Sequence, residues 1–214
     1  MALLLSVLEQ GMIYGILALG VYITYKILDF PDLTVDGSFP FGAAITVRLI
    51  NGFGVPAILT LPIAFLGGAL VGICTGLIHV KLKVRDLLSG IIMMTGLYTI
   101  NLWVAGSGYV AIFDKDNIFN NSFVNSITPG FLVNFKNVII IFLITMVAKY
   151  LLDWYMSTKS GFLLRAVGDN DTIVTSLGVD KGLVKIVGLS IANGLVSLSG
   201  CIYAQQQRSF EISI

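Results

Sequence analysis

The chain has 214 residues, of which 56% are hydrophobic and only 12% charged, and its mean hydropathy is +0.91. Soluble domains carry about 25% charged residues. This composition therefore excludes most soluble enzymes, disordered tails and nucleic-acid binders with a basic face. The net charge of +1 implies no strongly charged partner. The composition is that of an integral membrane protein.

Long apolar runs recur along the chain, and a transmembrane helix needs about 20 mostly apolar residues. Residues 39–50 form a shorter apolar stretch that ends near Arg48, and they predict a short, tilted or re-entrant helix. We expect an all-α, polytopic transmembrane helix bundle of about six segments, forming one domain over residues 1–214. The five longer runs cover residues 2–25, 55–80, 86–108, 137–152 and 183–204.

The distribution of Lys and Arg predicts the orientation in the membrane. Basic residues concentrate in the turn 81–85, in the stretch 149–185 and at Lys26. Placing these segments inside gives nine basic residues inside and four outside. The N-terminus then faces outside, and residues 109–136 form an external loop. The four basic residues left outside are Arg48, Lys115, Lys136 and Arg208.

Two sets of glycines repeat every four residues on one helix face. Gly68, Gly72 and Gly76 form one set, and Gly11 and Gly15 form the other. Small residues let helix backbones approach closely in lipid, where no hydrophobic force drives association. Both sets therefore predict packing against protein, either within the bundle or at a subunit interface.

Three carboxylates, Asp29, Asp32 and Asp36, lie between the first two apolar segments. Their spacing is not that of an EF-hand, and Pro31 breaks any helix there, so we predict no metal site. Asp36 and Ser38 are natural N-caps for the following helix in a solvated turn. The alternative is a structural joint or gate beside a translocation path.

Asn101 and Asn193 are the costliest uncharged polar residues within the apolar segments. They either hold helices together or line a polar pathway. The segments contain no pair of intramembrane carboxylates, and the chain carries no catalytic signature and no Walker A motif. We therefore expect no catalytic residues, no cofactor and no ATP hydrolysis by this chain alone.

The segment 153–182 is too polar to span a membrane. Gly168-Asp169-Asn170-Asp171 predicts a turn and an N-cap, and Gly178 predicts a C-cap. A helix over about 171–177 follows, and it is too short to be stable alone in water, so it must dock onto something. Its apolar residues on or near one face are Ile173, Val174 and Leu177.

The pattern STKSGFLLRAVGDNDTIVTSLGVD at 157–180, followed by KGLVKIVGLSIANGLVSLSGCIYA, resembles the permease subunits of ATP-binding-cassette importers. The closest likeness is to the branched-chain amino acid and ribose-type group. In that family this cytoplasmic loop docks into the ATPase subunit as a coupling helix. The matching positions are Gly161, Leu164, Arg165, Ala166, Gly168, Asp169, Asn170, Gly178 and Asp180.

The beginning of the chain supports the same resemblance. Gln10-Gly11 through Ala18-Leu19-Gly20 and Asp36-Gly37-Ser38 resemble the first helix and following turn of the family. Residues 30–38 resemble a subgroup associated with amino-acid uptake, which implies aromatic amino acids among the expected solutes. Family members usually continue with further membrane segments, so the chain is either truncated at its C-terminus or lacks the final spans.

The resemblance implies a permease of the bacterial cell membrane that translocates a small solute. The solute is expected to be an aromatic or branched-chain amino acid. The expected partners are an ATPase subunit inside, an external solute-binding lipoprotein, and a second copy or a homologous permease, with no nucleic acid. The alternative function is a passive channel or facilitator for a small polar solute.

Overall fold

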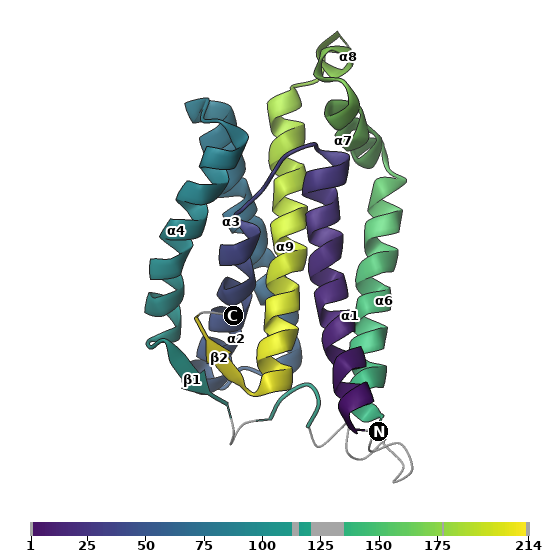
Figure 1. Ribbon diagram of the computed structural model, residues 1–214. Helices are drawn as coiled ribbons and strands as arrows, with labels where there is room; N and C mark the ends of the chain where they lie inside the picture. The colour runs from purple at the N-terminus through teal and green to yellow at the C-terminus, as the bar shows by residue number, and fades with distance from the viewer. Residues whose placement is uncertain (1, 113–115, 121–134, 177, 213–214) are drawn as a thin grey trace.

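The computed structural model of the protein describes residues 2–112, 116–120, 135–176 and 178–212. It is a bundle of long helices that run up and down beside one another (Figure 1). The long helices are α1 (Ala2–Tyr22), α2 (Val35–Phe53), α3 (Thr60–Leu82), α4 (Asp86–Ala105), α6 (Lys136–Met156) and α9 (Lys181–Gln207). The short elements are the π-helical turn η1 (Ile23–Ile27), the 3-10 turn η2 (Ala57–Leu59), α7 (Lys159–Asp169), α8 (Asp171–Ser176), β1 (Tyr109–Ala111) and β2 (Ser209–Glu211).

Five helical segments of the described chain are long and apolar enough to cross a membrane. Each of them overlaps one of the five long runs in the sequence. The all-α polytopic bundle is therefore confirmed, with the helix over 137–152 continuing to Met156. The five segments are Leu3–Ile27, Ala57–Leu82, Asp86–Ala105, Lys136–Met156 and Lys181–Gln207.

The sixth predicted segment, at 39–50, is longer than its apolar stretch. The structure extends it over the 19 residues of α2, which is about 28 Å of helix. The predicted start at residue 39 was wrong because Asp36, Gly37 and Ser38 are poor helix formers and interrupt the apolar pattern. Most of α2 is nevertheless buried by its neighbours.

α9 lies at the centre of the bundle and is the most buried of the five apolar segments. It packs against α1, α2 and α3 (Figure 1). α6 packs on the outside of α1, and α4 packs on α2. Residues of α2 and α9 are therefore held in place by contacts with several helices.

The two ends of the bundle carry different elements (Figure 1). α7 and α8 lie at one end, and the β1–β2 pair lies at the other end with the beginning of α1. β1 pairs antiparallel with β2, with Val110 opposite Phe210. The basic turn 81–85 lies at the α7 end. Following the predicted orientation, we call the α7 end cytoplasmic and the β1–β2 end external.

Candidate functional site

The chain turns back into the bundle between α1 and α2. The connecting residues leave the cytoplasmic end of α1 and run toward the middle of the bundle, where α2 begins (Figure 1). Ser38 Oγ donates a 2.6 Å hydrogen bond to Oδ1 of Asn193, which lies near the midpoint of α9. At 1.5 Å per residue, Asn193 is about 18 Å from the Lys181 end of α9 and about 21 Å from the Gln207 end. The first turn of α2 therefore lies at membrane depth.

Asp32 is a buried carboxylate close to this point and is only 2% exposed. Its Oδ1 accepts a 2.8 Å hydrogen bond from the backbone N–H of Thr34, and its Oδ2 accepts a 2.8 Å bond from Nδ2 of Asn193. Such bonds offset part of the cost of removing a carboxylate from water. Asn193 thus ties both the connecting segment and α2 to α9. Asn193 and Ser38 were predicted from the sequence as site residues, whereas this role of Asp32 was not.

Asp36 and Ser38 do not act as the predicted helix caps. The N-cap of α2 is Thr34, and no side-chain capping bond is made there. Ser38 is occupied by Asn193, and Asp36 is exposed on the surface of the chain. The carboxylate that accepts a backbone N–H is Asp32, because it lies two residues before Thr34 and can close a turn with it.

Asn101 joins α4 to α2 and is 1% exposed. Its Nδ2 donates a 3.2 Å hydrogen bond to the carbonyl oxygen of Gly37. Its Oδ1 is buried without a hydrogen-bond partner among the described residues. Asn101 therefore holds α4 on the first turn of α2, while one of its acceptors stays unused in this conformation.

Gly68, Gly72 and Gly76 lie along the contact of α3 with α9. A Cβ at Gly68 would overlap the carbonyl oxygen of Asn193, and one at Gly72 would overlap that of Leu189. At Gly76 a Cβ would come within 2.9 Å of a side chain of α9. The backbones of the two helices approach so closely that only glycine fits at these positions.

Gly11 and Gly15 have the same spacing but a different environment. A Cβ at either position would meet no atom within 4 Å among the described residues. These two glycines are therefore not packed against the described part of the chain. Their face of α1 also carries Tyr14 and Tyr22, which are 44% and 53% exposed.

β2 and its neighbours cover the external part of α2. Phe210 is 0% exposed and forms one buried cluster with Ala43 and Val47 of α2. Ile112, which follows β1, belongs to the same cluster. These strands could not be predicted from the sequence, because three residues are too few to show an alternating pattern.

Gln205 joins the loop after β1 to the helix bundle through hydrogen bonds. Its Oε1 accepts a 3.0 Å hydrogen bond from the backbone N–H of Ile118, and its Nε2 donates a 2.8 Å bond to Oγ1 of Thr60. It is 1% exposed. One side chain thus joins the loop after β1 to the ends of α9 and α3. Of the predicted external loop 109–136, residues 113–115 and 121–134 lie outside the described part.

The cytoplasmic segment contains a helix that was not predicted. α7 begins after Thr158, whose Oγ1 accepts a 3.4 Å bond from the backbone N–H of Gly161, and it ends at Asp169. The turn predicted over 168–171 is confirmed at Asn170, between α7 and α8, but Gly168 itself lies in the last turn of α7. It is glycine for a packing reason, since a Cβ there would overlap the carbonyl oxygen of Ile27.

The residues suggested for coupling fall into two groups. Gly161, Leu164 and Val174 are buried within the chain, and Leu164 and Val174 are 0% exposed. Ala166 and Gly168 are half-buried, and the exposed members are Arg165, Asp169 and Asn170. Asp180 caps α9, because its side chain accepts a 2.8 Å bond from the backbone N–H of Gly182. The buried members hold the segment on the bundle, so only the exposed members are available to a partner.

Phe162 is an exposed aromatic residue of α7 that the sequence analysis did not select. It is 60% exposed and lies three residues before Arg165, so both share one helix face. Asp169 continues this face one turn later. The signal that would have found Phe162 is the apolar period of α7, which places Leu164 and Val167 inside and leaves Phe162 outside.

α8 corresponds to the short helix predicted at about 171–177, and it covers Asp171–Ser176. Gly178 follows with φ of +75°, a left-handed conformation suited to the predicted C-cap, and its N–H donates a 3.1 Å bond to Thr175 O. The side chains of Asp171 and Ile173 and the whole of Leu177 lie outside the described residues. Coupling through α8 stays a prediction.

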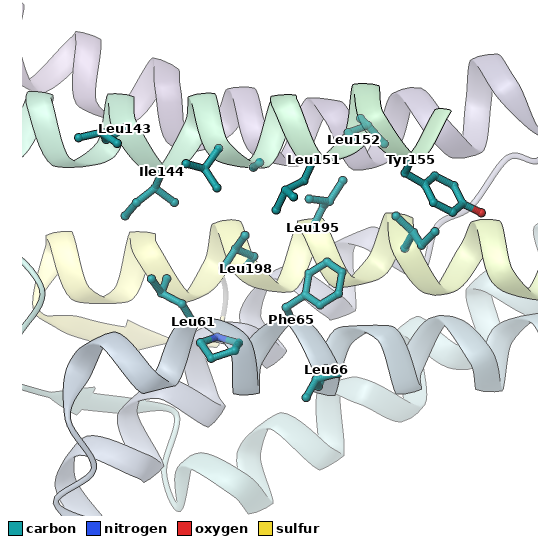
Figure 2. Close-up of a pocket in the computed structure, with 14 residues that line it drawn as sticks. Leu61, Phe65, Leu66, Leu143, Ile144, Leu151, Leu152, Tyr155, Leu195 and Leu198 are labelled. Atoms are coloured by element: carbon teal, nitrogen blue, oxygen red, sulfur yellow. The ribbon is translucent and has the colours of Figure 1, made fainter. Parts of the chain in front are cut away.

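An apolar groove of about 740 Å³ lies between α3, α6 and α9. Figure 2 shows Phe65, Leu152 and Leu195 approaching it from the three helices. The only polar group among its lining side chains is the hydroxyl of Tyr155, which bonds to Ser160 Oγ at 2.8 Å. Because nothing in its walls could orient a polar solute, we do not assign the groove to a translocation path.

The described part of the chain offers no cluster of three or more His, Cys, Asp or Glu residues that could hold a metal ion. Cys74 and Cys201 are both free thiols. His79 bonds to the carbonyl oxygen of Val84 at 2.9 Å and lies 3.2 Å from Asp86 Oδ1, so it fastens the turn between α3 and α4.

A family model described as the branched-chain amino acid transport system / permease component matches residues 3–214. The chain belongs to this family. The match covers every membrane segment, so the resemblance drawn from residues 157–204 is confirmed. The chain is a multi-pass membrane protein, and members of this permease family are transport components rather than enzymes.

Three relatives illustrate the range of the permease family. The tyrosine transport system permease protein of Clostridioides difficile (strain R20291) is 42% identical over 203 residues, which cover 94% of this chain and 64% of the relative. The probable branched-chain amino acid transport permease protein LivH of Methanocaldococcus jannaschii is 26% identical over 204 residues, covering 91% of this chain and 64% of the relative. The ribose import permease protein RbsC of Haemophilus influenzae is 25% identical over 207 residues, covering 96% and 62%.

The chain therefore spans slightly less than two thirds of the length of these three permeases. No solved structure is a significant match to it.

Proposed function

We propose that this chain is the membrane-spanning permease of an ATP-binding-cassette importer that carries an aromatic or branched-chain amino acid across a bacterial inner membrane. The observation that carries the proposal is the family match over residues 3–214, together with 42% identity to a tyrosine transport permease. A separate ATPase supplies the energy, and an external solute-binding lipoprotein delivers the solute. The permease pairs with a second copy or with a homologous permease.

The ATPase docks at the exposed face of α7 and at α8. A helix of six residues is unstable alone in water, so α8 depends on contacts with other elements. Phe162 and Arg165 place an exposed aromatic ring and a cation on one helix face, and aromatic residues and Arg are enriched at protein interfaces. Gly161 and Leu164 fix this face relative to the bundle, so that motion of the partner reaches α6, α9 and η1.

The solute passes beside the first turn of α2. Ser38, Asn101 and Asn193 bond to groups of this chain, so we assign them to positioning α2. Asp36 is left exposed at the same depth and is the candidate pathway residue. The face of α1 with Gly11 and Gly15 flanks this region, and we assign that face to the contact between two permeases.

A double variant of the full-length permease, Phe162→Asp with Arg165→Glu, tests the docking surface. We expect it to insert normally, to lose the ATPase that co-purifies with the tagged wild type, and to abolish amino-acid uptake. The matched control is Phe53→Asp, which changes an exposed phenylalanine (70%) at the opposite end of the bundle. This control should retain the ATPase.

The proposal fails if the double variant keeps its ATPase and its uptake. Depletion of cellular ATP gives a separate readout, because an importer driven by ATP stops when ATP is removed. Uptake that persists after depletion identifies a passive facilitator instead.

A further inference from the structure

Asp36 is exposed at membrane depth. It precedes by two residues Ser38, whose hydroxyl bonds to Asn193 near the midpoint of α9. Within the described residues its side chain makes no hydrogen bond or ion pair. A carboxylate that faces lipid hydrocarbon is strongly unfavourable, so ionisable groups at this depth face protein or water-filled cavities. The surface at Asp36 therefore meets water or a polar partner.

The face of α2 that carries Asp36 is covered by other residues toward the external end of the helix. Asp36, Pro40, Ala43 and Val47 recur at helical spacing along this face. The last three are buried, and the cluster that covers Ala43 and Val47 includes Phe210. The face thus opens at Asp36, just to the cytoplasmic side of the cover formed around β2.

Asp36 carries a backbone acceptor that lacks its helical donor, in addition to its carboxylate. Pro40 has no backbone N–H, so it cannot donate the helical bond that residue i normally gives to the carbonyl four residues earlier, which here is that of Asp36. The Asp36 carboxylate lies on the same residue. The nearest cation of α2 is Arg48, three turns away, and its guanidinium lies 6.0 Å from the centre of the Phe53 ring.

Two aromatic side chains lie close to Asp36 along α2 and the neighbouring α1. Phe39 follows Asp36 by three residues on α2, and its ring stacks on that of Tyr14 with centroids 6.0 Å apart. Tyr14 is 44% exposed, so its ring lies partly at the surface, against Phe39. Aromatic faces attract cations and pack against aromatic or aliphatic side chains.

We propose that Asp36 binds the protonated amino group of the transported solute, with the Tyr14 ring beside it. Oxygen acceptors with no donor among them fit an ammonium group, which has three donors and no acceptor. The site therefore selects solutes that carry an amine over neutral sugars. This inference rests on the proposed function, because it assigns the solute class within the same pathway.

The first stage of the test identifies the solute that the wild type carries. Full-length permease with its ATPase and binding protein is assayed in cells for ATP-dependent uptake of L-tyrosine, L-leucine and D-ribose. ATP-independent uptake, or no uptake, contradicts the proposed function and the inference together. ATP-dependent uptake of D-ribose alone contradicts the inference and leaves ATP-driven import standing.

The second stage measures solute binding to the permease–ATPase complex in nanodiscs without the binding protein. The competitors for L-tyrosine are tyramine, which keeps the amine, and 3-(4-hydroxyphenyl)propionate, which lacks it. For L-leucine they are isopentylamine and 4-methylpentanoate. The variants are Asp36→Asn and Asp36→Glu. Asp29→Asn is the matched control because Asp29 is an exposed carboxylate seven residues earlier in the chain.

We expect Asp36→Asn to weaken binding of the amino acid and the amine by about tenfold or more, the effect of losing a hydrogen bond to a charged group. The acid analogue should be unaffected, Asp36→Glu should keep the preference for the amine, and Asp29→Asn should behave as wild type. Unchanged binding by Asp36→Asn overturns the inference. Equal weakening of the amine and the acid, or loss of permease pairing with the amine preference intact, overturns it as well.

Discussion

Glycines recur at the same four-residue spacing in the α3–α9 contact and on the exposed face of α1, but their surroundings differ. At Gly68 and Gly72 any side chain would overlap a carbonyl oxygen of α9, whereas at Gly11 and Gly15 a Cβ would meet no atom of the described chain. The first region is closed within one chain, and the second is open. Spacing of small residues thus reveals a surface suited to close approach but not which helix approaches it.

The same contrast separates two aspartates four residues apart. Asp32 is 2% exposed, and both its oxygens accept hydrogen bonds from this chain. Asp36 is exposed. We call the α3–α9 contact together with Asp32 the closed side of the chain, and the exposed face of α1 together with Asp36 the open side. The closed side therefore holds the bundle together, and the open side is where solute and a second permease are expected to meet it.

The largest expected effect is on the closed side. Gly72→Leu should prevent stable folding, because overpacking of a tight contact costs about 1–3 kcal/mol or more and here the obstruction is backbone. Thermal unfolding and the yield of purified full-length permease measure it. Gly96→Leu is the matched control, since a Cβ at Gly96 meets nothing within 4 Å among the described residues. Equal yield and stability of the two variants would contradict the packing of α3 on α9.

A smaller effect is expected at the buried carboxylate. In a double-mutant cycle, Asp32→Ala and Asn193→Ala should show a coupling energy in unfolding between about 0.6 and 1.7 kcal/mol, the average and the maximum for polar pairs within a membrane bundle. The parallel cycle with Asp36→Ala and Asn193→Ala should give a coupling near zero, because those two side chains share no bond. A coupling of similar size in both cycles would remove the distinction between the two aspartates.

The smallest effect on stability is expected on the open side. Gly15→Leu should leave the unfolding temperature of the permease unchanged, because a Cβ at this position meets no atom within 4 Å among the described residues. It should lower the yield of cross-linked permease pairs formed through a cysteine introduced at Ala18, an exposed position of α1. The control is Gly96→Leu with the same cysteine. A clear loss of stability in Gly15→Leu would show that this face is packed within one polypeptide.

The sequence predicts the long helices well because each carries a run of apolar residues near the length of a membrane span. α3 is the clearest example, as no formal charge interrupts residues 55–80. The start of α2 is hidden because Asp36, Gly37 and Ser38 have the composition of a turn. Their helical state depends on bonds to α4 and α9, residues far away in the chain.

The candidate site was predicted less completely for the same reason. Asp32 and Asp36 are chemically identical, so only the tertiary structure separates a bonded carboxylate from an exposed one. Gly168 has the local signature of a turn, but it is glycine because α7 packs against the Ile27 carbonyl. Arg165 was selected by resemblance, while Phe162 on the same face is recognised from the apolar period of α7, a helix that was not predicted.

The accessibility of a cysteine at position 36 to a charged, membrane-impermeant thiol reagent tests the open side most directly. The measurement uses full-length permease in membranes with Cys74 replaced by serine, and it compares Asp36→Cys with Leu70→Cys, an exposed apolar position (63%) at similar depth on α3. A water-filled path predicts rapid labelling at position 36, slowed by the transported solute, and no labelling at position 70. Equal lack of reaction at both positions would contradict the account, because it would place Asp36 away from water.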